Sequence, residues 1–252
     1  MLLRLLIIRS CSSLKVLKGS GKVITDNYKE VEANVIEACK KAGRDPKEVL
    51  LIAVSKTKPL SDIEELIKIG VKDFGENKPQ ELKAKFEDVS TPVNFHQIGH
   101  LQTNKIKYII DKAVLIHSVD SFHLAEAIEK EAAKRDMIAN VLIEVNIANE
   151  ESKFGVKKEE TEKLIREISV LSHVKIKGLM TIAPFVENPE DNRLYFREMK
   201  HLLLDIKSKN IDNVDMETLS MGMTNDYKIA IEEGSTMVRV GTAIFGERNY
   251  AI

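Results

Sequence analysis

A lysine stands at the end of the most apolar stretch of this sequence, 51-LIAVSKTKP-59. The apolar, β-branched run predicts a buried strand, and Lys56 is followed by turn residues and Pro59. An amine that is partly shielded from water loses its proton more readily, and only the neutral amine attacks a carbonyl carbon. The position of Lys56 therefore predicts a lysine that forms a Schiff base with an aldehyde or a ketone.

Two short segments late in the chain have the composition of a phosphate site. Ser220 opens 220-SMGMTND-226, which leads into a helix pattern, and Gly241 and Thr242 offer a bare backbone and a hydroxyl group. Backbone N–H groups next to a helix N-terminus bind phosphate readily. A phosphate site beside a reactive lysine indicates a phosphorylated carbonyl compound, either a sugar phosphate, as in an aldolase, or pyridoxal 5′-phosphate (PLP).

The elements that would position these residues alternate along the chain. A helix pattern at 26–43 is followed by eight predicted strands: 49–56, 71–77, 93–99, 113–118, 141–147, 176–183, 214–220 and 237–246. Helix patterns lie between them, for example at 121–135 and 157–172. Eight strands, each but the last followed by a helix, predict one closed (β/α)8 TIM barrel with an additional N-terminal helix.

The helix at 61–70 has the clearest local signals at its ends. Ser61 is predicted as the N-cap with Glu64 in the capping-box position, and Gly70 is predicted to end the helix.

The barrel topology places two charged residues together. Active sites of such barrels lie at the carboxyl ends of the strands, and closure pairs the last strand with the first. Alternation gives Lys56 the parity of Ile52 and Val54, and Arg239 the parity of Gly241. If both faces point inward, Lys56 and Arg239 share the barrel mouth, where the arginine would help to lower the pKa of the lysine.

Composition excludes several classes of protein. The 252 residues carry 38 basic and 39 acidic side chains, so no basic field is available for nucleic acid. The two cysteines, Cys11 and Cys39, provide no disulfide framework, and a reducing, cytoplasmic compartment fits. Residues 1–22 are basic, apolar and free of acids; they are expected to be a disordered extension, with organelle targeting as the alternative. Residues 23–252 are expected to form a single domain, and no membrane segment is predicted.

The remaining titratable groups have structural interpretations. His96 and His100 have an HxxxH spacing, but they flank a predicted strand and not a helix, so we expect no metal site. His96 is expected to donate or accept a hydrogen bond at the barrel mouth, and His117 either lies near a ligand or packs in the interior. Glu76 is expected to fix the geometry of its neighbour, with a role as a base as the alternative. Lys58 shares the parity of Lys56 but lies one step further out, where water reaches it.

Seven motifs of this sequence resemble those of the pyridoxal phosphate homeostasis protein family. The resemblance covers about residues 26 to 249 in collinear order. It rests on 53-AVSKTKP-59, 74-FGEN-77, 96-HQIGHLQTNK-105, 117-HSVDS-121, 146-NIANEESKFGV-156, 178-GLMTIAP-184 and, above all, 219-LSMGMTNDYKIAIEEGSTMVRVGTAIFGER-248.

The resemblance implies the barrel of alanine racemase, which is fold type III among PLP proteins, and it implies roles for individual residues. Lys56 matches the lysine that carries PLP, and Arg239 matches the residue that faces the pyridine nitrogen and weakens the ring as an electron sink. Ser220, Gly241 and Thr242 match phosphate contacts, and Asn77 matches a polar residue near the ring. The extension at residues 1–22 departs from the family pattern and puts the location in doubt, not the site.

The implied function is non-catalytic: binding of PLP and a part in vitamin B6 and amino acid homeostasis. PLP-dependent apo-enzymes are the expected partners, no nucleic acid or membrane is expected, and the expected state is a monomer, with a weak dimer as the alternative. The alternative function is a PLP-dependent amino acid racemase. Racemases of this fold take a tyrosine as second base from another domain and a partner subunit, and none of the five tyrosines here follows a predicted strand.

Overall fold

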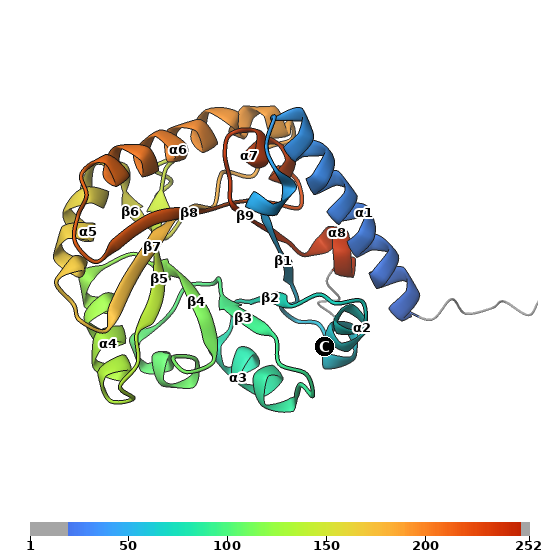
Figure 1. Cartoon of the computed structure of the whole chain (residues 1–252), viewed down its shortest axis with the longest axis horizontal. Helices are drawn as coiled ribbons and strands as arrows, with labels where there is room; N and C mark the ends of the chain where they lie inside the picture. The colour runs from blue at the N-terminus through green and yellow to red at the C-terminus, as the bar shows by residue number, and fades with distance from the viewer. Residues whose placement is uncertain (1–19, 248–252) are drawn as a thin grey trace, which may run out of the picture.

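The computed structural model describes residues 20–247, which form a closed ring of parallel strands surrounded by helices (Figure 1). The ring strands are β1 (Leu50–Val54), β2 (Asp73–Glu76), β3 (Asn94–Gln97), β4 (Ala113–Val119), β5 (Ala139–Asn146), β7 (Val174–Met180), β8 (Val214–Met223) and β9 (Met237–Val240). A short strand, β6 (Val156–Lys157), pairs with the end of β5. The predicted (β/α)8 barrel is confirmed.

The barrel closes between its last strand and its first strand, as predicted. β9 pairs with β1, and Ile52 stands opposite Arg239 in this register. On the other side of the ring, β4 pairs with β5 and completes the closure. Val54 and Arg239 line the same pocket, so the two strands present matching parities to the interior.

Side chains fill the barrel interior in layers, as barrels of this type require. The lower layer is a small apolar cluster formed by Leu115, Leu142, Met180 and Met237. Alternation then places His117, Glu144 and Arg239 one step higher on three of the same strands, nearer to their carboxyl ends. The much larger apolar core lies outside the ring, between the strands and the helices. A polar layer therefore separates the apolar floor from the barrel mouth.

Eight α-helices cover the outside of the described barrel: α1 (Ser20–Lys41), α2 (Leu60–Lys68), α3 (Pro79–Asp88), α4 (Phe122–Ala133), α5 (Thr161–Ser169), α6 (Arg193–Ser208), α7 (Tyr227–Glu232) and α8 (Thr242–Phe245). The N-terminal helix α1 packs against α2, α7 and α8, and so covers the β1–β9 seam (Figure 1). The Asn27 amide donates to the carbonyl of Ile244 at 3.0 Å. Helix α1 thus covers the part of the β1–β9 seam that α8, with only four residues, is too short to cover.

Several boundaries differ from the predicted ones. Residues 20–22 belong to α1, while the rest of the predicted extension, residues 1–19, lies outside the described residues. The last strand ends at Val240, and Thr242–Phe245 form α8 where strand was predicted. β3 is followed by a 3-10 helix, Thr103–Tyr108, and not by an α-helix.

The predicted capping box at Ser61 is wrong. α2 begins at Leu60, and Pro59 occupies the N-cap position without a side-chain cap. Proline fixes the backbone for helix entry and has no N–H group to satisfy, so the helix starts earlier than the serine suggested. Gly70 does follow the helix end, with a φ of 93°.

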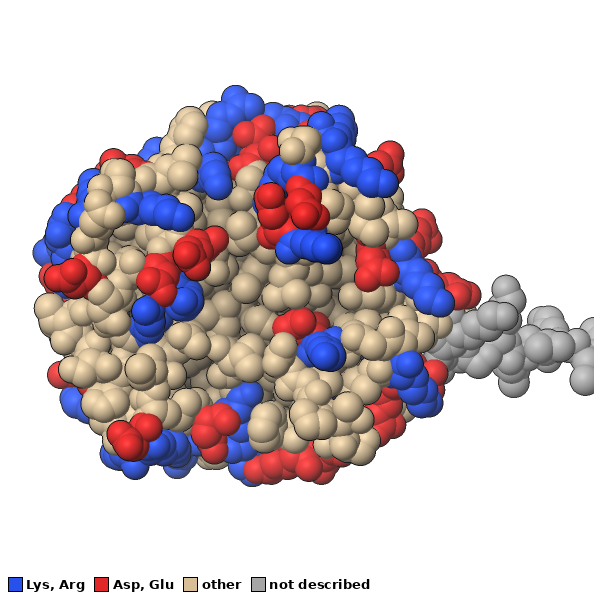
Figure 2. All heavy atoms as spheres, viewed as in Figure 1, with Lys and Arg blue, Asp and Glu red and all other residues tan. Residues whose placement is uncertain are grey.

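Charges are mixed over the surface. In Figure 2, basic and acidic side chains alternate around the face in view, and uncharged atoms fill its centre. Within residues 20–247 no helix is long and apolar enough to cross a membrane. The same residues contain no cluster of three metal-ligating side chains.

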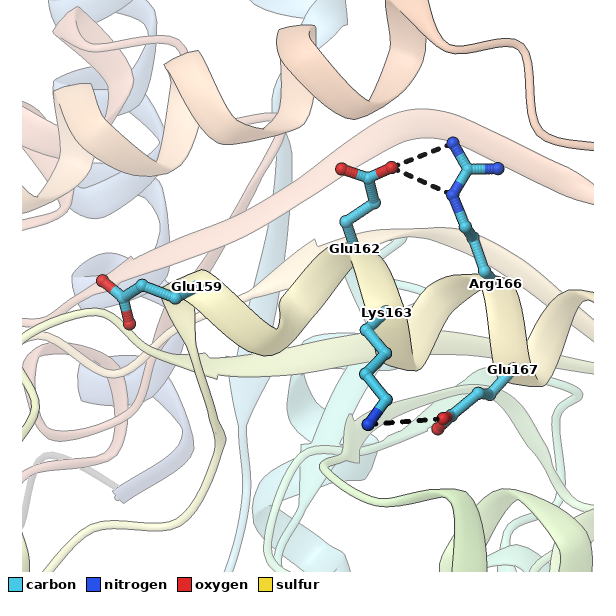
Figure 3. A pocket seen from close by; sticks show the side chains of 5 residues that line it. All are labelled: Glu159, Glu162, Lys163, Arg166 and Glu167. Carbon is cyan, nitrogen blue, oxygen red and sulfur yellow. Dashed lines mark hydrogen bonds and ion pairs between the residues drawn. The ribbon is translucent and has the colours of Figure 1, made fainter.

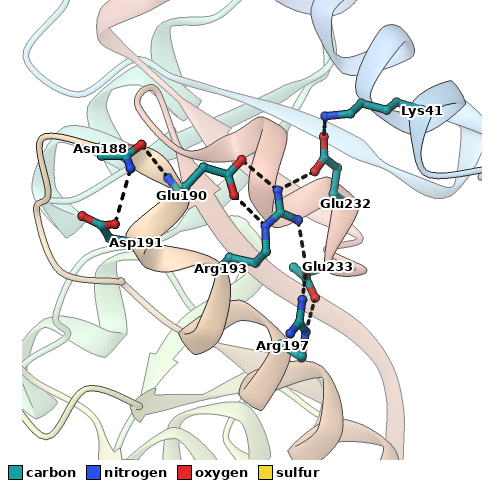
Figure 4. Close-up of polar contacts among 8 residues, drawn as sticks. All are labelled: Lys41, Asn188, Glu190, Asp191, Arg193, Arg197, Glu232 and Glu233. Carbon is teal, nitrogen blue, oxygen red and sulfur yellow. Dashed lines mark hydrogen bonds and ion pairs between the residues drawn. The ribbon is translucent and has the colours of Figure 1, made fainter.

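One charged network ties the helices around the seam together (Figure 4). Arg193 at the start of α6 pairs with Glu190, with Glu232 at 2.7 Å and with Glu233 at 2.9 Å. Lys41 at the end of α1 pairs with the other oxygen of Glu232. Because Glu232 and Glu233 are largely buried, this network links α1, α6 and α7 more firmly than an exposed ion pair would.

Replacement of Arg193 by alanine is expected to lower the free energy of unfolding by about 1–2 kcal/mol, since two largely buried carboxylates lose charged donors. The matched control is Arg166→Ala on α5, where Arg166 pairs with Glu162 on an open, charged helix face (Figure 3). That change should cost less than about 0.5 kcal/mol. Urea titrations of both variants measure the difference, and equal losses would contradict the assigned importance of the seam network.

Candidate functional site

A pocket of about 660 Å³ opens at the carboxyl ends of the strands. That volume is typical of a small-molecule site. The predicted residues Lys56, Asn77, Arg239, Gly241 and Thr242 all line it. Five of the six predicted site residues therefore meet in one place, and they come from the exits of β1, β2 and β9.

Lys56 sits on a turn that needs support from outside the barrel. The next residue, Thr57, has a φ of 65°, in the left-handed region that residues other than glycine rarely occupy. The Thr57 N–H donates to Glu81 of α3 at 2.6 Å. This bond helps to hold the turn in a conformation that would otherwise be unfavourable, and so fixes where the Lys56 side chain starts.

A buried lysine connects that turn to the barrel wall. Lys85 of α3 donates to the backbone carbonyl of Ser55 at 2.8 Å, to Glu76 at 2.7 Å and to Glu81 at 2.7 Å. The hydroxyl of Ser55 donates to the same oxygen of Glu76 at 2.6 Å. Burial raises the pKa of Glu76 to about 6, while Lys85 opposes the rise. As expected, Glu76 fixes its neighbours: the cluster holds Ser55 and Thr57 on either side of Lys56.

Lys58 has a structural role that the sequence did not reveal. Its ammonium group donates to the carbonyls of Phe245, at 2.8 Å, and Glu247, at 3.0 Å. A cation at the carboxyl end of a helix satisfies carbonyls that lack partners within the helix. Lys58 therefore fastens the end of α8 to the turn, and Lys56 is the lysine that lines the main pocket.

Arg239 forms the buried side of the pocket. It is 4% exposed and donates to the hydroxyl of Ser220 and, at 2.8 Å, to the carbonyl of Thr181. Burial lowers the pKa of Arg239 to about 10, and Glu144 opposes the shift. The guanidinium is therefore still charged at neutral pH and is held rigidly by neutral partners.

Ser220 differs from its predicted place. Its side chain is fully buried, and its hydroxyl lies between Arg239 and His117 rather than on the pocket surface. The residue acts on the site from beneath, by holding the arginine. Alternation within β8 could have indicated this, because Ser220 lies between the outward-facing Leu219 and Met221.

A chain of hydrogen bonds continues from Ser220 through the barrel. His117 lies 3.0 Å from the Ser220 hydroxyl and 3.1 Å from His96, and His96 lies 3.2 Å from Asp73. Burial, with the neighbouring His96 and Arg239, lowers the pKa of His117 well below its ordinary value, so this ring is neutral. One direction gives every group in the chain a partner: Arg239 donates to Ser220, Ser220 to His117, His117 to His96, and His96 to Asp73.

Replacement of Ser220 by alanine should lower the free energy of unfolding by about 1–3 kcal/mol, because Arg239 and His117 both lose a buried partner. Ser90→Ala, at an exposed position, is the matched control and should change stability by less than about 0.5 kcal/mol. Thermal unfolding of the two variants measures the effect. A Ser220→Ala variant as stable as its control would show that the chain contributes nothing to folding.

The β9 exit brings a bare backbone close to the lysine turn. A Cβ atom on Gly241 would lie 3.2 Å from the carbonyl oxygen of Val54. Gly241 is half-buried and Thr242, the first residue of α8, is exposed. The two residues also line a small second cavity together with Lys56 and Lys58. An anion in this position would lie next to the backbone of Gly241 and to Thr242, with Lys56 and Lys58 among the surrounding residues.

The rim of the pocket is apolar and aromatic. Phe154 stacks on His100 with ring centroids 3.8 Å apart, and Phe185 is 91% exposed beside them in the same pocket wall. Ile182 and Met223 complete the apolar side of the rim. No sequence motif indicated this rim, because its residues come from the carboxyl ends of four different strands, β3, β5, β7 and β8.

Glu144 is a further pocket residue that sequence reasoning missed. It lies on β5, two residues beyond the interior residue Leu142, and lines the pocket with Arg239. Burial, together with Asp120, raises the pKa of Glu144 to about 7, and Arg239 opposes the rise. The period of two in β5 placed this side chain inward, and an acid inside a barrel strand was the available signal.

Residues 27–249 match the alanine racemase, N-terminal domain, family. The chain is 44% identical over 226 residues to the pyridoxal phosphate homeostasis protein of Aquifex aeolicus, covering 89% of this chain and 98% of that protein. This chain belongs to the pyridoxal phosphate homeostasis protein family. The resemblance seen in the sequence motifs is thereby confirmed.

Solved structures support the membership of this family. PipY of Synechococcus elongatus, in a structure described as having PLP bound, shares 29% identity and superposes with a TM-score of 0.77, over 88% of this chain and 100% of that one. Alanine racemase of Corynebacterium glutamicum shares 16% identity, with a TM-score of 0.63 over 88% of this chain and 62% of the racemase. That likeness shows the fold alone.

Proposed function

We propose that this protein binds PLP as a Schiff base on Lys56 and holds it without turning over an amino acid, as part of vitamin B6 and amino acid homeostasis. The observation that carries the proposal is one pocket lined by Lys56, Arg239, Gly241 and Thr242. The structure of the relative PipY with PLP bound supports it. Bound PLP would supply a reactive aldehyde and an electron-withdrawing ring.

The residues present fit PLP. Lys56 offers an amine to the aldehyde, and the Gly241–Thr242 backbone with Lys58 nearby offers donors to the phosphate. Arg239 offers a permanent cation to the ring nitrogen, which leaves that nitrogen unprotonated and limits carbanion chemistry. Asn77 offers a polar group near the ring. Ser220 contributes by fixing Arg239.

The residues around the pocket also favour binding of PLP without turnover over amino acid racemisation. Among residues 20–247 no tyrosine lines the pocket. Tyr28 and Tyr227 are buried against helices, and Tyr108 and Tyr195 pack at the edge of the outer core. A two-base racemase needs a second acid–base group on the far side of the substrate, and Glu144 lies deep in the wall beside Arg239 instead.

The visible spectrum of the purified protein, before and after borohydride, tests the proposal. We expect a yellow protein whose chromophore is reduced irreversibly onto Lys56, as shown by peptide mapping. An adduct on any other residue would overturn the assignment. Proton exchange at Cα of amino acids in deuterated water tests the second function: turnover beyond one exchange per bound PLP would identify an enzyme.

PLP-dependent apo-enzymes as recipients, a monomeric state and a cytoplasmic location remain predictions of the sequence. They are not needed for the binding proposal.

A further inference from the structure

A buried carboxyl group without a hydrogen-bond donor lies in the wall of the pocket. Glu144 is 5% exposed, and no group among residues 20–247 donates a hydrogen bond to its Oε2 atom. A buried carboxyl oxygen without a partner is costly, whether the group is neutral or charged. Oε2 itself is buried, but Glu144 lines the ligand pocket, so a bound ligand can approach the carboxyl group through its other oxygen.

The surroundings do not give Glu144 a compensating ion pair. Arg239 directs its guanidinium at Ser220 and Thr181, and in the described part of the chain it forms no ion pair with Glu144. The charged and titratable groups on the surrounding elements are His117 and Asp120 of β4 and its exit, Lys56 and His100 across the pocket, and Arg239. The other neighbouring strand, β7, presents Met180 to the interior.

These surroundings make the protonated form of Glu144 accessible near neutral pH. Burial is the main cause of its raised pKa of about 7, and Asp120 adds to it more than Arg239 removes. An anion placed in the same pocket would favour the proton further, because two like charges at low dielectric repel strongly. A protonated carboxyl group has an O–H to donate, which an ionised one lacks.

We propose that Glu144 contacts the bound pyridoxal ligand as a neutral carboxylic acid that donates a hydrogen bond to an oxygen of the ligand, so that binding takes up a proton. The inference rests on the proposed function. It assigns Glu144 as a ligand-contacting group and makes retention of the anionic ligand dependent on pH. Ligand is held more tightly below about pH 7 and released more readily above it.

The test separates this carboxyl group from the Schiff base. Pyridoxine 5′-phosphate carries an alcohol in place of the aldehyde, so its binding does not involve the amine of Lys56 as a nucleophile. Its dissociation constant is measured by calorimetry from about pH 6 to 9 for the wild type and for Glu144→Gln, whose amide keeps the size and a donor. Two buffers of different ionisation enthalpy report the protons taken up.

Above about pH 7, the dissociation constant of the wild type is expected to rise with pH relative to that of Glu144→Gln. One linked proton gives a rise of up to tenfold per pH unit. The wild type should take up close to one proton more than the variant at about pH 8.5. Glu151→Gln, an exposed acid after the same strand, should behave as the wild type.

Two outcomes would overturn the inference. Identical pH profiles and proton uptake in the wild type and Glu144→Gln would show that the carboxyl group does not respond to ligand. Tighter binding of pyridoxamine 5′-phosphate by the wild type than by Glu144→Gln, increasing with pH, would show an ionised carboxylate that holds an ammonium group. Failure of the wild type to form an adduct on Lys56 would overturn the proposed function instead, so the two failures are distinguishable.

Discussion

Replacement of Lys56 by alanine is expected to remove the visible chromophore and any borohydride-stable adduct. The variant should hold PLP at least about 100-fold more weakly, because only the covalent bond to the amine keeps the aldehyde in place. Folding should be little affected, since Lys56 lies on a turn at the barrel mouth and outside the packed layers. Absorbance after gel filtration with excess PLP, together with thermal unfolding, measures both effects.

Lys58→Ala is the matched control, two residues along the same turn. It removes the bonds to Phe245 and Glu247 and should loosen α8, but the adduct on Lys56 should still form. A stable adduct in Lys56→Ala, or its loss in Lys58→Ala alone, would transfer the assignment to the second lysine.

Replacement of Lys85 by methionine is expected to cost about 3–5 kcal/mol of folding free energy, because it leaves the fully buried Glu76 without its cation. The same change frees the Ser55 carbonyl and removes one support of Glu81, which holds Thr57. PLP retention should therefore fall even under conditions where the variant is folded. Denaturant titration and PLP binding at low temperature measure the two losses.

The cost of Lys85→Met should grow with pH. Burial raises the pKa of Glu76 to about 6 in the wild type, and loss of Lys85 raises it further. A carboxyl group with a raised folded-state pKa binds its proton more tightly in the folded than in the unfolded chain, so its stabilising contribution is lost as pH rises through that pKa. The variant should be closest to the wild type near pH 5. Lys83→Met, which breaks only an exposed pair with Glu87, should show little effect at either pH.

The parts of the site that follow from strand periodicity could be predicted from the sequence. Lys56 and Arg239 were placed together by alternation along β1 and β9 and by closure of an eight-stranded ring, and both line the pocket. The same rule applied to β5 would have placed Glu144 inside. It was overlooked because a single acid in an apolar strand carries no motif.

The supports of the site could not be predicted in this way. The left-handed backbone of Thr57 is held by Glu81, and Ser55 by Lys85, across separations of 24 and 30 residues. No local sequence pattern in α3 or in the turn indicates that the two are in contact. Contacts of this kind depend on how a helix packs against its strands. Hydrophobic periodicity shows which face of the helix is buried, but it leaves the position of the helix along the strands undetermined by a turn or two.

The place of α1 has a consequence for how the chain acquires its structure. Asn27 bonds to Ile244 across 217 residues, and the apolar face of α1 rests on α7 and α8 near the other end of the described chain. During synthesis α1 can pack against α2 early, but the part of α1 that contacts α7 and α8 has no partner until those last helices have left the ribosome. Closure of the seam is therefore a late, non-local step with a large loop-closure entropy. The nascent barrel therefore stays open, with exposed apolar surface, for almost the entire time of its translation.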